Sequence, residues 1–475
     1  MTISAPRPRI AILAGAWLLG LNIFAQTTAK GGDTALLGVI AASLNCLCGL
    51  ALLLIGRPSF PALRRMAPPI LLLGAALAWA IWPDLYGARQ DGQAARIAPD
   101  LTAADVARYL GSVCLLVGAA AFSARRGAQR AAMKALALCI GANLLCGLIL
   151  RQVDPHRVWG IRKGMLADRF TGTMLNANAM ATVYAMGAVI ALGLALVALR
   201  DRNRPFRDYP LAPLAFIAVF MGALGAIGPT GSRTAMASAL IASALLAFLH
   251  FSKRQRRNVH GIAIGAAIVS IGGMLVIGGL VTMRRLPNLG VDAIQRWELW
   301  DHYLAIAGQA GPFGYGLGSF AQVNSAMLPA NLTATDLWYV NAAHNVVLQM
   351  VIEGGLIFCL LACLAIVIIA VGVVRRWPER GDPATILQRA GASALLIALL
   401  GGMVDVALNV PAVVTLAASV LGLLWGRSLR PARRKGGAFQ PASSSRRRRS
   451  RRAGGGGDRI APAQPLFQTE IVANK

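Results

Sequence analysis

Long apolar runs recur along the whole chain, and they restrict it to one kind of fold. About twelve runs are long and apolar enough to cross a bilayer as helices, which takes roughly 20 residues each. Only 14% of the residues are charged, whereas a soluble protein carries about 25%. The sequence therefore predicts an all-α integral membrane protein, built as a bundle of about twelve transmembrane helices. The predicted helices cover residues 10–25, 34–55, 67–83, 107–123, 132–150, 179–199, 211–228, 234–250, 261–282, 346–374, 385–404 and 410–426.

Basic residues fall in every second connection between these runs, which predicts the orientation of the chain. The short basic connections include residues 57–65, 125–130, 200–207, 253–257 and 375–380. All of them lie on one side if every predicted helix is kept, and the positive-inside rule makes that side cytoplasmic. The first run follows basic residues, as a signal peptide does. We interpret it as a retained helix because many more apolar runs follow.

The formal net charge of +28 is partly concentrated at the C-terminal end. From Arg427 to Lys475 the chain has 13 basic and 2 acidic residues, together with runs of serine, arginine and glycine. Such low-complexity composition is typical of disorder. We therefore predict a membrane domain over residues 1–427 and a disordered cytoplasmic tail over residues 428–475 that contacts anionic lipid headgroups. We expect no nucleic-acid partner, because the sequence predicts no folded basic domain that could bind one.

The sequence offers no recognisable metal or nucleotide motif. All seven cysteines lie in apolar runs, without the spacing of a zinc site. The glycine-rich stretch over residues 311–318 is preceded by no strand and followed by no Gly-Lys-Ser/Thr, so we interpret its glycines as allowing tight backbone turns. We expect chemistry without a metal or cofactor.

The connections on the other side of the membrane are longer, and long loops between helices often carry function. They cover residues 84–106, 151–178 and 283–345. The last is rich in aromatic residues, so we expect it to lie at the membrane interface and to be partly helical around residues 292–307. On this outer side, Arg169, Arg233, Arg296 and His344 stand out.

Arginine and histidine suit the binding and transfer of a phosphate-bearing substrate. Arg233 lies in a tight turn over residues 228–233, and a guanidinium can bind phosphate oxygens in a bidentate way. Any single outer arginine can equally extend from a helix end to lipid phosphates, and we prefer that reading for Arg162 and Lys163. His344 precedes a predicted helix, where its imidazole can act as a general base, or simply cap the helix or satisfy a neighbouring group.

A polar stripe follows His344 into the membrane. Asn345, Gln349 and Glu353 recur every four residues, so they share one face of a helix. Polar groups at this depth face the interior of the bundle. They serve either a substrate site or hydrogen bonding between helices.

Four stretches resemble the motifs of the O-antigen ligase and polymerase superfamily of bacterial envelope enzymes, over roughly residues 165–360. They occur in the order and spacing of that family, although Ala177 stands where proline is usual. The stretches are Arg169-Phe170-Thr171-Gly172-Thr173 with Asn176-Ala177-Asn178, Thr230-Gly231-Ser232-Arg233, Arg296-Trp297 through Gly318-Ser319-Phe320, and Ala343-His344-Asn345 with Gln349 and Glu353-Gly354-Gly355.

The resemblance implies a metal-independent glycosyltransferase in the bacterial inner membrane. Such an enzyme transfers glycan from undecaprenyl pyrophosphate at the periplasmic face, with arginines binding the donor phosphates and the histidine as base. The implied catalytic residues are Arg233, Arg296 and His344, and the implied substrate-binding residues are Arg169, Asn178, Asn345 and Glu353.

Three functions remain open on the sequence alone. A ligase would join glycan to a lipid A-core acceptor. A polymerase would instead extend a growing O-antigen or exopolysaccharide on the same carrier. A transporter is the third alternative, because transporters place charged groups near the middle of the membrane. Most predicted helix centres are apolar here, and Glu353, Asp405 and Asn409 are the exceptions that keep this alternative open.

Overall fold

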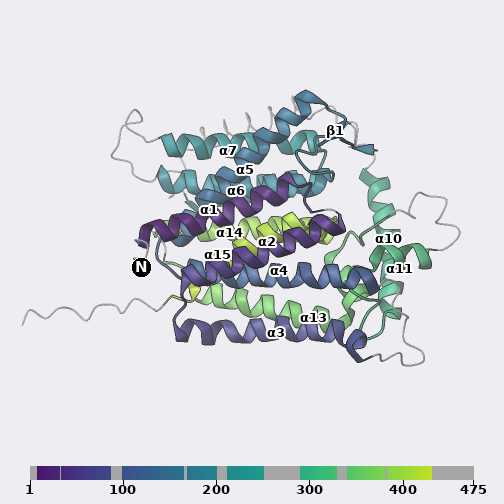
Figure 1. The fold of residues 1–475 in the computed structure, drawn as a ribbon. Coiled ribbons are helices and arrows are strands. Elements are labelled where there is room, and N and C mark those ends of the chain that lie inside the picture. The colour runs from purple at the N-terminus through teal and green to yellow at the C-terminus, as the bar shows by residue number, and fades with distance from the viewer. Residues whose placement is uncertain are drawn as a thin grey trace, which may run out of the picture. The chain divides into compact units, whose positions relative to one another are not determined.

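The computed structural model describes residues 8–32, 34–86, 99–164, 168–199, 211–250, 289–328, 340–379 and 382–430. These residues belong to one compact unit that ends at Arg430. Nearly all of its secondary structure is helical (Figure 1). The predicted helix over residues 261–282 and nearly all of the predicted tail lie outside the described residues.

Within these residues, eleven helices are long and apolar enough to cross a membrane. They confirm the all-α membrane fold and coincide with eleven of the predicted runs. The helices are α1 (Pro8–Thr28), α2 (Ala35–Gly56), α3 (Phe60–Tyr86), α4 (Pro99–Ser123), α5 (Ala128–Val153), α6 (Ala177–Ala198), α7 (Leu211–Ile227), α8 (Arg233–His250), α13 (Val346–Arg375), α14 (Pro383–Val404) and α15 (Pro411–Ser428). Helix α3 starts seven residues before its predicted run, because the helix continues past its apolar part through Arg64 and Arg65.

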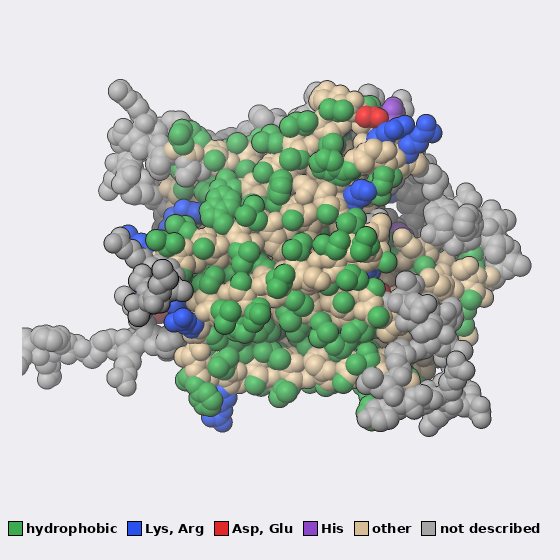
Figure 2. All heavy atoms as spheres, in the orientation of Figure 1, with side chains coloured by type: hydrophobic (Ala, Val, Ile, Leu, Met, Phe, Trp, Pro, Cys, Tyr) green, Lys and Arg blue, Asp and Glu red, His purple; other side chains and the backbone are tan. Residues whose placement is uncertain are grey.

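Apolar side chains cover the outside of the bundle between its two ends. Figure 2 shows hydrophobic groups spread over the middle of one face, with lysine and arginine side chains gathered at the ends. Leu36 and Leu360, for example, are largely exposed. A surface of this kind would be unfavourable in water, and it fits contact with lipid chains.

Helix α6 lies at the centre and is almost completely buried. It packs against α5, α7, α8 and α14. Alanine and glycine make up much of its surface, and small residues allow neighbouring helices to approach closely. A Cβ added at Gly193 would lie 2.5 Å from the Cβ of Ala390 on α14. This helix therefore serves as the core of the bundle.

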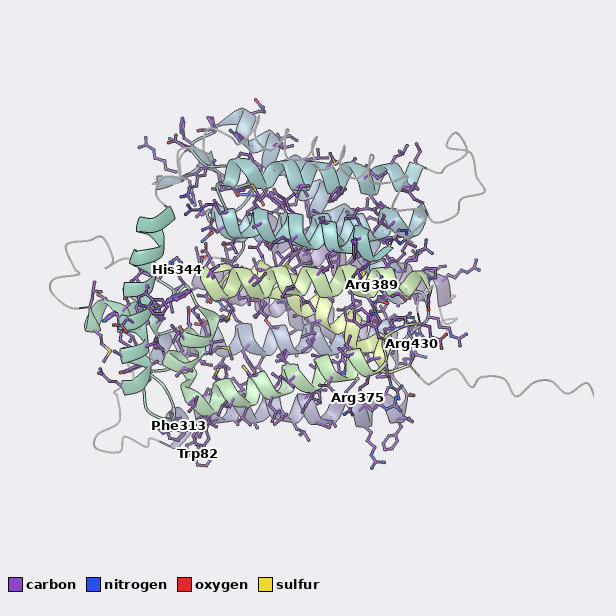
Figure 3. All side chains as sticks on the ribbon, turned by 180° about the vertical axis from the view of Figure 1, so that it is seen from behind. Trp82, Phe313, His344, Arg375, Arg389 and Arg430 are labelled. Carbon is purple, nitrogen blue, oxygen red and sulfur yellow. The ribbon has the colours of Figure 1, made fainter. Side chains whose placement is uncertain are left out.

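The two ends of the bundle differ. Helices α10 (Leu289–Gln309) and α11 (Phe320–Met327) lie at one end, together with the short antiparallel pair β1 (Arg157–Val158) and β2 (Ile161–Arg162) (Figure 1). His344 lies at this end, which we call the site end, and Arg375, Arg389 and Arg430 lie at the opposite, basic end (Figure 3). The prediction of short helices in the long loop is confirmed.

Candidate active site

The glycine-rich loop inserts into a break in α13. The sequence predicts one continuous helix here, but Gly355 has φ 80° and ψ 168°, which interrupts the helical backbone. Two carbonyls next to the break accept hydrogen bonds from the loop: the Tyr315 amide donates to the Ile352 oxygen (2.8 Å) and the Gly316 amide to the Glu353 oxygen (2.9 Å). The loop thereby satisfies backbone groups that the broken helix leaves open.

Close backbone contact explains why glycine stands at two of these positions. A Cβ at Gly314 would lie 2.5 Å from the Glu353 oxygen, and one at Gly355 would lie 2.0 Å from the Pro312 oxygen. Both residues also have positive φ, which other residues rarely adopt. Trp79 of α3 secures the loop, because its indole donates to the Pro312 oxygen (2.8 Å) and stacks on Phe313 (4.4 Å between centroids). The glycines therefore allow tight turns, as predicted.

His344 is placed by the loop that leads into α13. The side-chain oxygen of Asn345 caps that helix by accepting from the amides of Val347 (3.0 Å) and Leu348 (3.1 Å). The cap is therefore Asn345, and the reading of His344 as the helix cap is wrong. His344 has φ 52°, an uncommon conformation for a residue other than glycine, which often marks functional positions.

A buried carboxylate lies beside the imidazole of His344. The Nδ1 atom of His344 is 3.7 Å from Oδ1 of Asp405, and the Asp405 side chain is 9% exposed. Asn178 at the start of α6 donates to Oδ2 of Asp405 (2.6 Å), and the Val406 amide donates to Oδ1 (2.7 Å). Asp405 is thus fixed from two directions. A carboxylate at Nδ1 turns the other ring nitrogen, Nε2, away from itself.

The polar stripe on α13 connects with the same cluster. Gln349 donates to Oε1 of Glu353 (3.1 Å), and its own oxygen accepts from the Ala343 amide (3.2 Å) and from the side chain of Asn409. Glu353 also accepts from the Phe320 amide (3.3 Å) at the start of α11. The stripe therefore faces protein, as predicted from its spacing. These bonds give Glu353 and Asn345 structural partners, and their substrate-binding roles stay predictions.

The turns that carry Arg169 and Arg233 lie next to each other. The Phe170 amide donates to the Pro229 oxygen (2.9 Å) in the one-turn helix η3 (Gly228–Thr230), and Arg233 begins α8 just after it. Both arginines are half-buried. Unpaired amides at the start of a helix also favour anions, so a phosphate here would meet two sources of positive potential.

Lys163 points inward and supports this turn. It is almost buried, and its ammonium donates to the Arg169 oxygen (3.2 Å). Desolvation lowers the pKa of Lys163, and the nearby Arg151 lowers it further. The interpretation of Lys163 as reaching outward to lipid phosphates is therefore wrong, because its amine is used inside the protein. Arg162 is exposed, and its lipid contact stays a prediction.

Arg296 belongs to α10, a helix anchored at the site end. Its side chain lies outside the described part of the structure. Further along the helix, Tyr303 is buried, donates to Asn324 (3.0 Å) and packs edge-on against Phe320 (5.0 Å). These contacts fix α10 on α11.

Asp405 is a site residue that the sequence analysis does not predict. The backbone leaves the helix at Asp405, between α14 and η4 (Ala407–Asn409), in agreement with the predicted end of the apolar run at residue 404. Asp405, Glu353 and Asn409 all join the polar network around His344 and Gln349. The transporter alternative stays a prediction.

The fold and the polar cluster define a polytopic membrane protein whose reactive groups gather at one end of the bundle. Residues 216–363 match the family model described as O-antigen ligase. This part of the chain is therefore similar to the O-antigen ligase family, whose members are glycan ligases and polymerases, as the motifs predicted. The matched segment includes Arg233, Arg296 and His344 but neither Asn178 nor Asp405. No curated protein matches the chain.

Proposed function

We propose that the protein is a metal-independent ligase of the bacterial inner membrane. It transfers glycan from undecaprenyl pyrophosphate to a lipid A-core or similar acceptor at the periplasmic face. The observation that carries this proposal is the pairing of His344, which lies in the segment similar to the O-antigen ligase family, with the buried Asp405 at one end of the bundle.

The arginines would bind the donor. A lipid pyrophosphate is a good leaving group, so its departure needs stabilisation of negative charge more than a strong acid. The adjacent turns of Arg169 and Arg233, with the start of α8, offer that charge, and Arg296 is expected to add to it. The bond between the sugar and the pyrophosphate oxygen breaks, and undecaprenyl pyrophosphate leaves.

His344 would activate the acceptor. Nε2 takes the proton of the acceptor hydroxyl as its oxygen forms the new bond to the sugar. Asp405 holds the ring through Nδ1 and stabilises the charge that develops on it, while Asn178 and the Val406 amide hold Asp405. The contact of 3.7 Å is longer than a hydrogen bond, and catalytic contacts often shorten once substrate is bound.

Sidedness supports a periplasmic site. His344 lies at the end opposite Arg375, Arg389 and Arg430 (Figure 3), and the basic end belongs in the cytoplasm by the positive-inside rule. A single cysteine placed at exposed Arg162 should react with an impermeant maleimide in intact cells whose outer membrane is permeabilised. One placed at Arg64 should react only after lysis. The reverse pattern would contradict the proposal.

A polymerase on the same carrier is the alternative, and a deletion strain separates the two. Loss of a ligase leaves bare core lipid, whereas loss of a polymerase leaves core capped with a single repeat. Glycan profiling of the deletion strain, with and without the intact gene, therefore decides between the acceptors.

Asp405→Asn should reduce glycan transfer about 100-fold or more, because the amide cannot stabilise a protonated imidazole or hold the same ring orientation. The measurement is the transfer rate of purified protein with lipid-linked glycan. Asp154→Asn is the control: it lies at the same end, its side chain is half-buried, and its carboxylate accepts from the His156 amide (2.8 Å) and pairs loosely with Arg157 (3.6 Å), away from His344. Equal rates for the two variants would remove Asp405 from the mechanism.

Arg233→Ala should abolish transfer, and Arg233→Lys should recover only a small part of it. Lysine restores the charge but not the planar fork that binds two phosphate oxygens, so we expect a deficit of roughly ten-fold or more. The deficit should appear in the binding of lipid-linked donor as well as in the rate. Arg162→Lys, at the same end, should change neither quantity. Wild-type donor binding by Arg233→Lys would show that charge alone suffices.

A further inference from the structure

A pocket of about 370 Å³ lies at the basic end, between α3, α13 and α15. Its apolar wall comes mainly from α13, where Val367 and Val371 stand one turn apart on one face. Arg375 continues that face by another turn. Along α13 the pocket thus changes from apolar to basic over about 12 Å, given the rise of 1.5 Å per residue.

Gly372 lines this pocket, and its missing side chain leaves space there. A Cβ added there would meet only the Ser428 hydroxyl, at 3.9 Å, so the space beside the helix is open. Trp425 of α15, which is buried, closes the pocket on one side. Residues of α13 and α15 therefore form the wall of the pocket that faces the bundle.

Three arginines line the rim: Arg65 from α3, and Arg375 and Arg376 from the end of α13. Among the residues that the structure describes, no carboxylate pairs with any of them. The neighbouring Asp382 pairs with Arg427 instead (3.1 Å). Within the described residues, the rim is therefore positive and has no carboxylate partner.

Further positive charge surrounds this rim. Arg376 donates to the Arg430 oxygen (2.9 Å), and the Arg430 guanidinium donates to the Ser123 oxygen (2.7 Å). Burial lowers the pKa of Arg430 to about 10, and the nearby Arg427 and Arg126 contribute to that shift. The surroundings of the pocket thus favour an anion.

We propose that this pocket binds an anionic phospholipid, with the headgroup phosphate on Arg65, Arg375 and Arg376 and an acyl chain along Val367 and Val371. A free phosphate would leave the apolar wall unused. The chain after Arg430 is itself basic overall, so like charge disfavours it as the occupant. Basic pockets between membrane helices on the cytoplasmic side are known to suit acidic lipid headgroups.

The test is retention of lipid by the purified full-length chain, measured by native mass spectrometry after incubation with phosphatidylglycerol. Arg65→Gln/Arg375→Gln should lower retention about ten-fold, from the loss of two charges near the headgroup. Arg64→Gln/Arg389→Gln removes the same charge outside the pocket and should retain lipid like wild type. Arg64 precedes Arg65 on α3, and Arg389 lies at the basic end (Figure 3). Gly372→Leu keeps every charge and fills the hollow, so it should also lower retention.

Other outcomes would overturn the proposal. Equal retention by the Arg65→Gln/Arg375→Gln variant and its control would show that the charge is not used. Unchanged retention by Gly372→Leu would show that the apolar wall is not used. Equal binding of inorganic phosphate would indicate a free anion, and equal retention of phosphatidylcholine would indicate a site without charge selectivity. If the double arginine variant fails to fold, Gly372→Leu decides alone.

Discussion

Replacing His344 with alanine should abolish glycan transfer while leaving the protein folded in the membrane. A general base contributes a factor of about 100 to 10,000 to a rate. The fold should persist because the side chain of Asn345, rather than that of His344, caps α13. The measurement combines the transfer rate of purified protein with its thermal unfolding in detergent.

His156→Ala is the matched control for this variant. His156 is an exposed histidine in the β1 loop at the same end of the bundle, so it should have full activity. Transfer by His344→Ala at the rate of this control would exclude an imidazole base, and the acceptor would then have to be activated in another way. Loss of thermal stability in His344→Ala alone would instead indicate a structural role.

Replacing Gly355 with alanine should disconnect the glycine-rich loop from α13. The new Cβ would lie 2.0 Å from the Pro312 oxygen, in a backbone with φ 80°. The backbone strain and the loss of two hydrogen bonds should together cost on the order of 3 kcal/mol. The piece of α13 that follows His344 depends on these bonds for its position. We therefore expect a lower unfolding temperature and loss of transfer.

Gly308→Ala tests the same change where there is space. Gly308 lies within α10, and nothing comes within 4 Å of an added Cβ. Alanine favours a helix over glycine by about 1 kcal/mol, so this variant should be neutral or slightly stabilised. Normal activity and stability of Gly355→Ala would show that the loop is free to shift away, contrary to the docking that we describe.

The sequence predicted the helices well because length and apolar composition alone decide whether a segment can cross a bilayer. Spacing along a helix also predicted that Asn345, Gln349 and Glu353 share one face, and the bond between Gln349 and Glu353 confirms it for those two. In each case the signal lies within one short stretch of chain.

Contacts between residues far apart in the sequence could not be predicted from local patterns. Asn178 and Asp405 are 227 residues apart, and no local pattern indicates that they meet. The break at Gly355 depends on hydrogen bonds from the glycine-rich loop. The glycine pattern of that loop does not indicate which helix it contacts. The sequence predicts Lys163 at the surface, and only its hydrogen bond to the Arg169 oxygen shows that the side chain points inward. A usable signal for Asp405 is its place between the apolar runs 385–404 and 410–426, because that connection lies on the same predicted side of the membrane as His344.

The enclosed position of α6 has a consequence for where the enzyme can work. Helices that touch lipid tilt or shift when the bilayer becomes thinner or thicker, whereas α6 is surrounded by protein on nearly all sides. Asn178 is the second residue of that helix and donates a hydrogen bond to the carboxylate of Asp405, which lies beside His344. We therefore expect the spacing of these reactive groups to persist across membranes of different fatty-acid content, as when a bacterium adjusts its lipids to growth temperature.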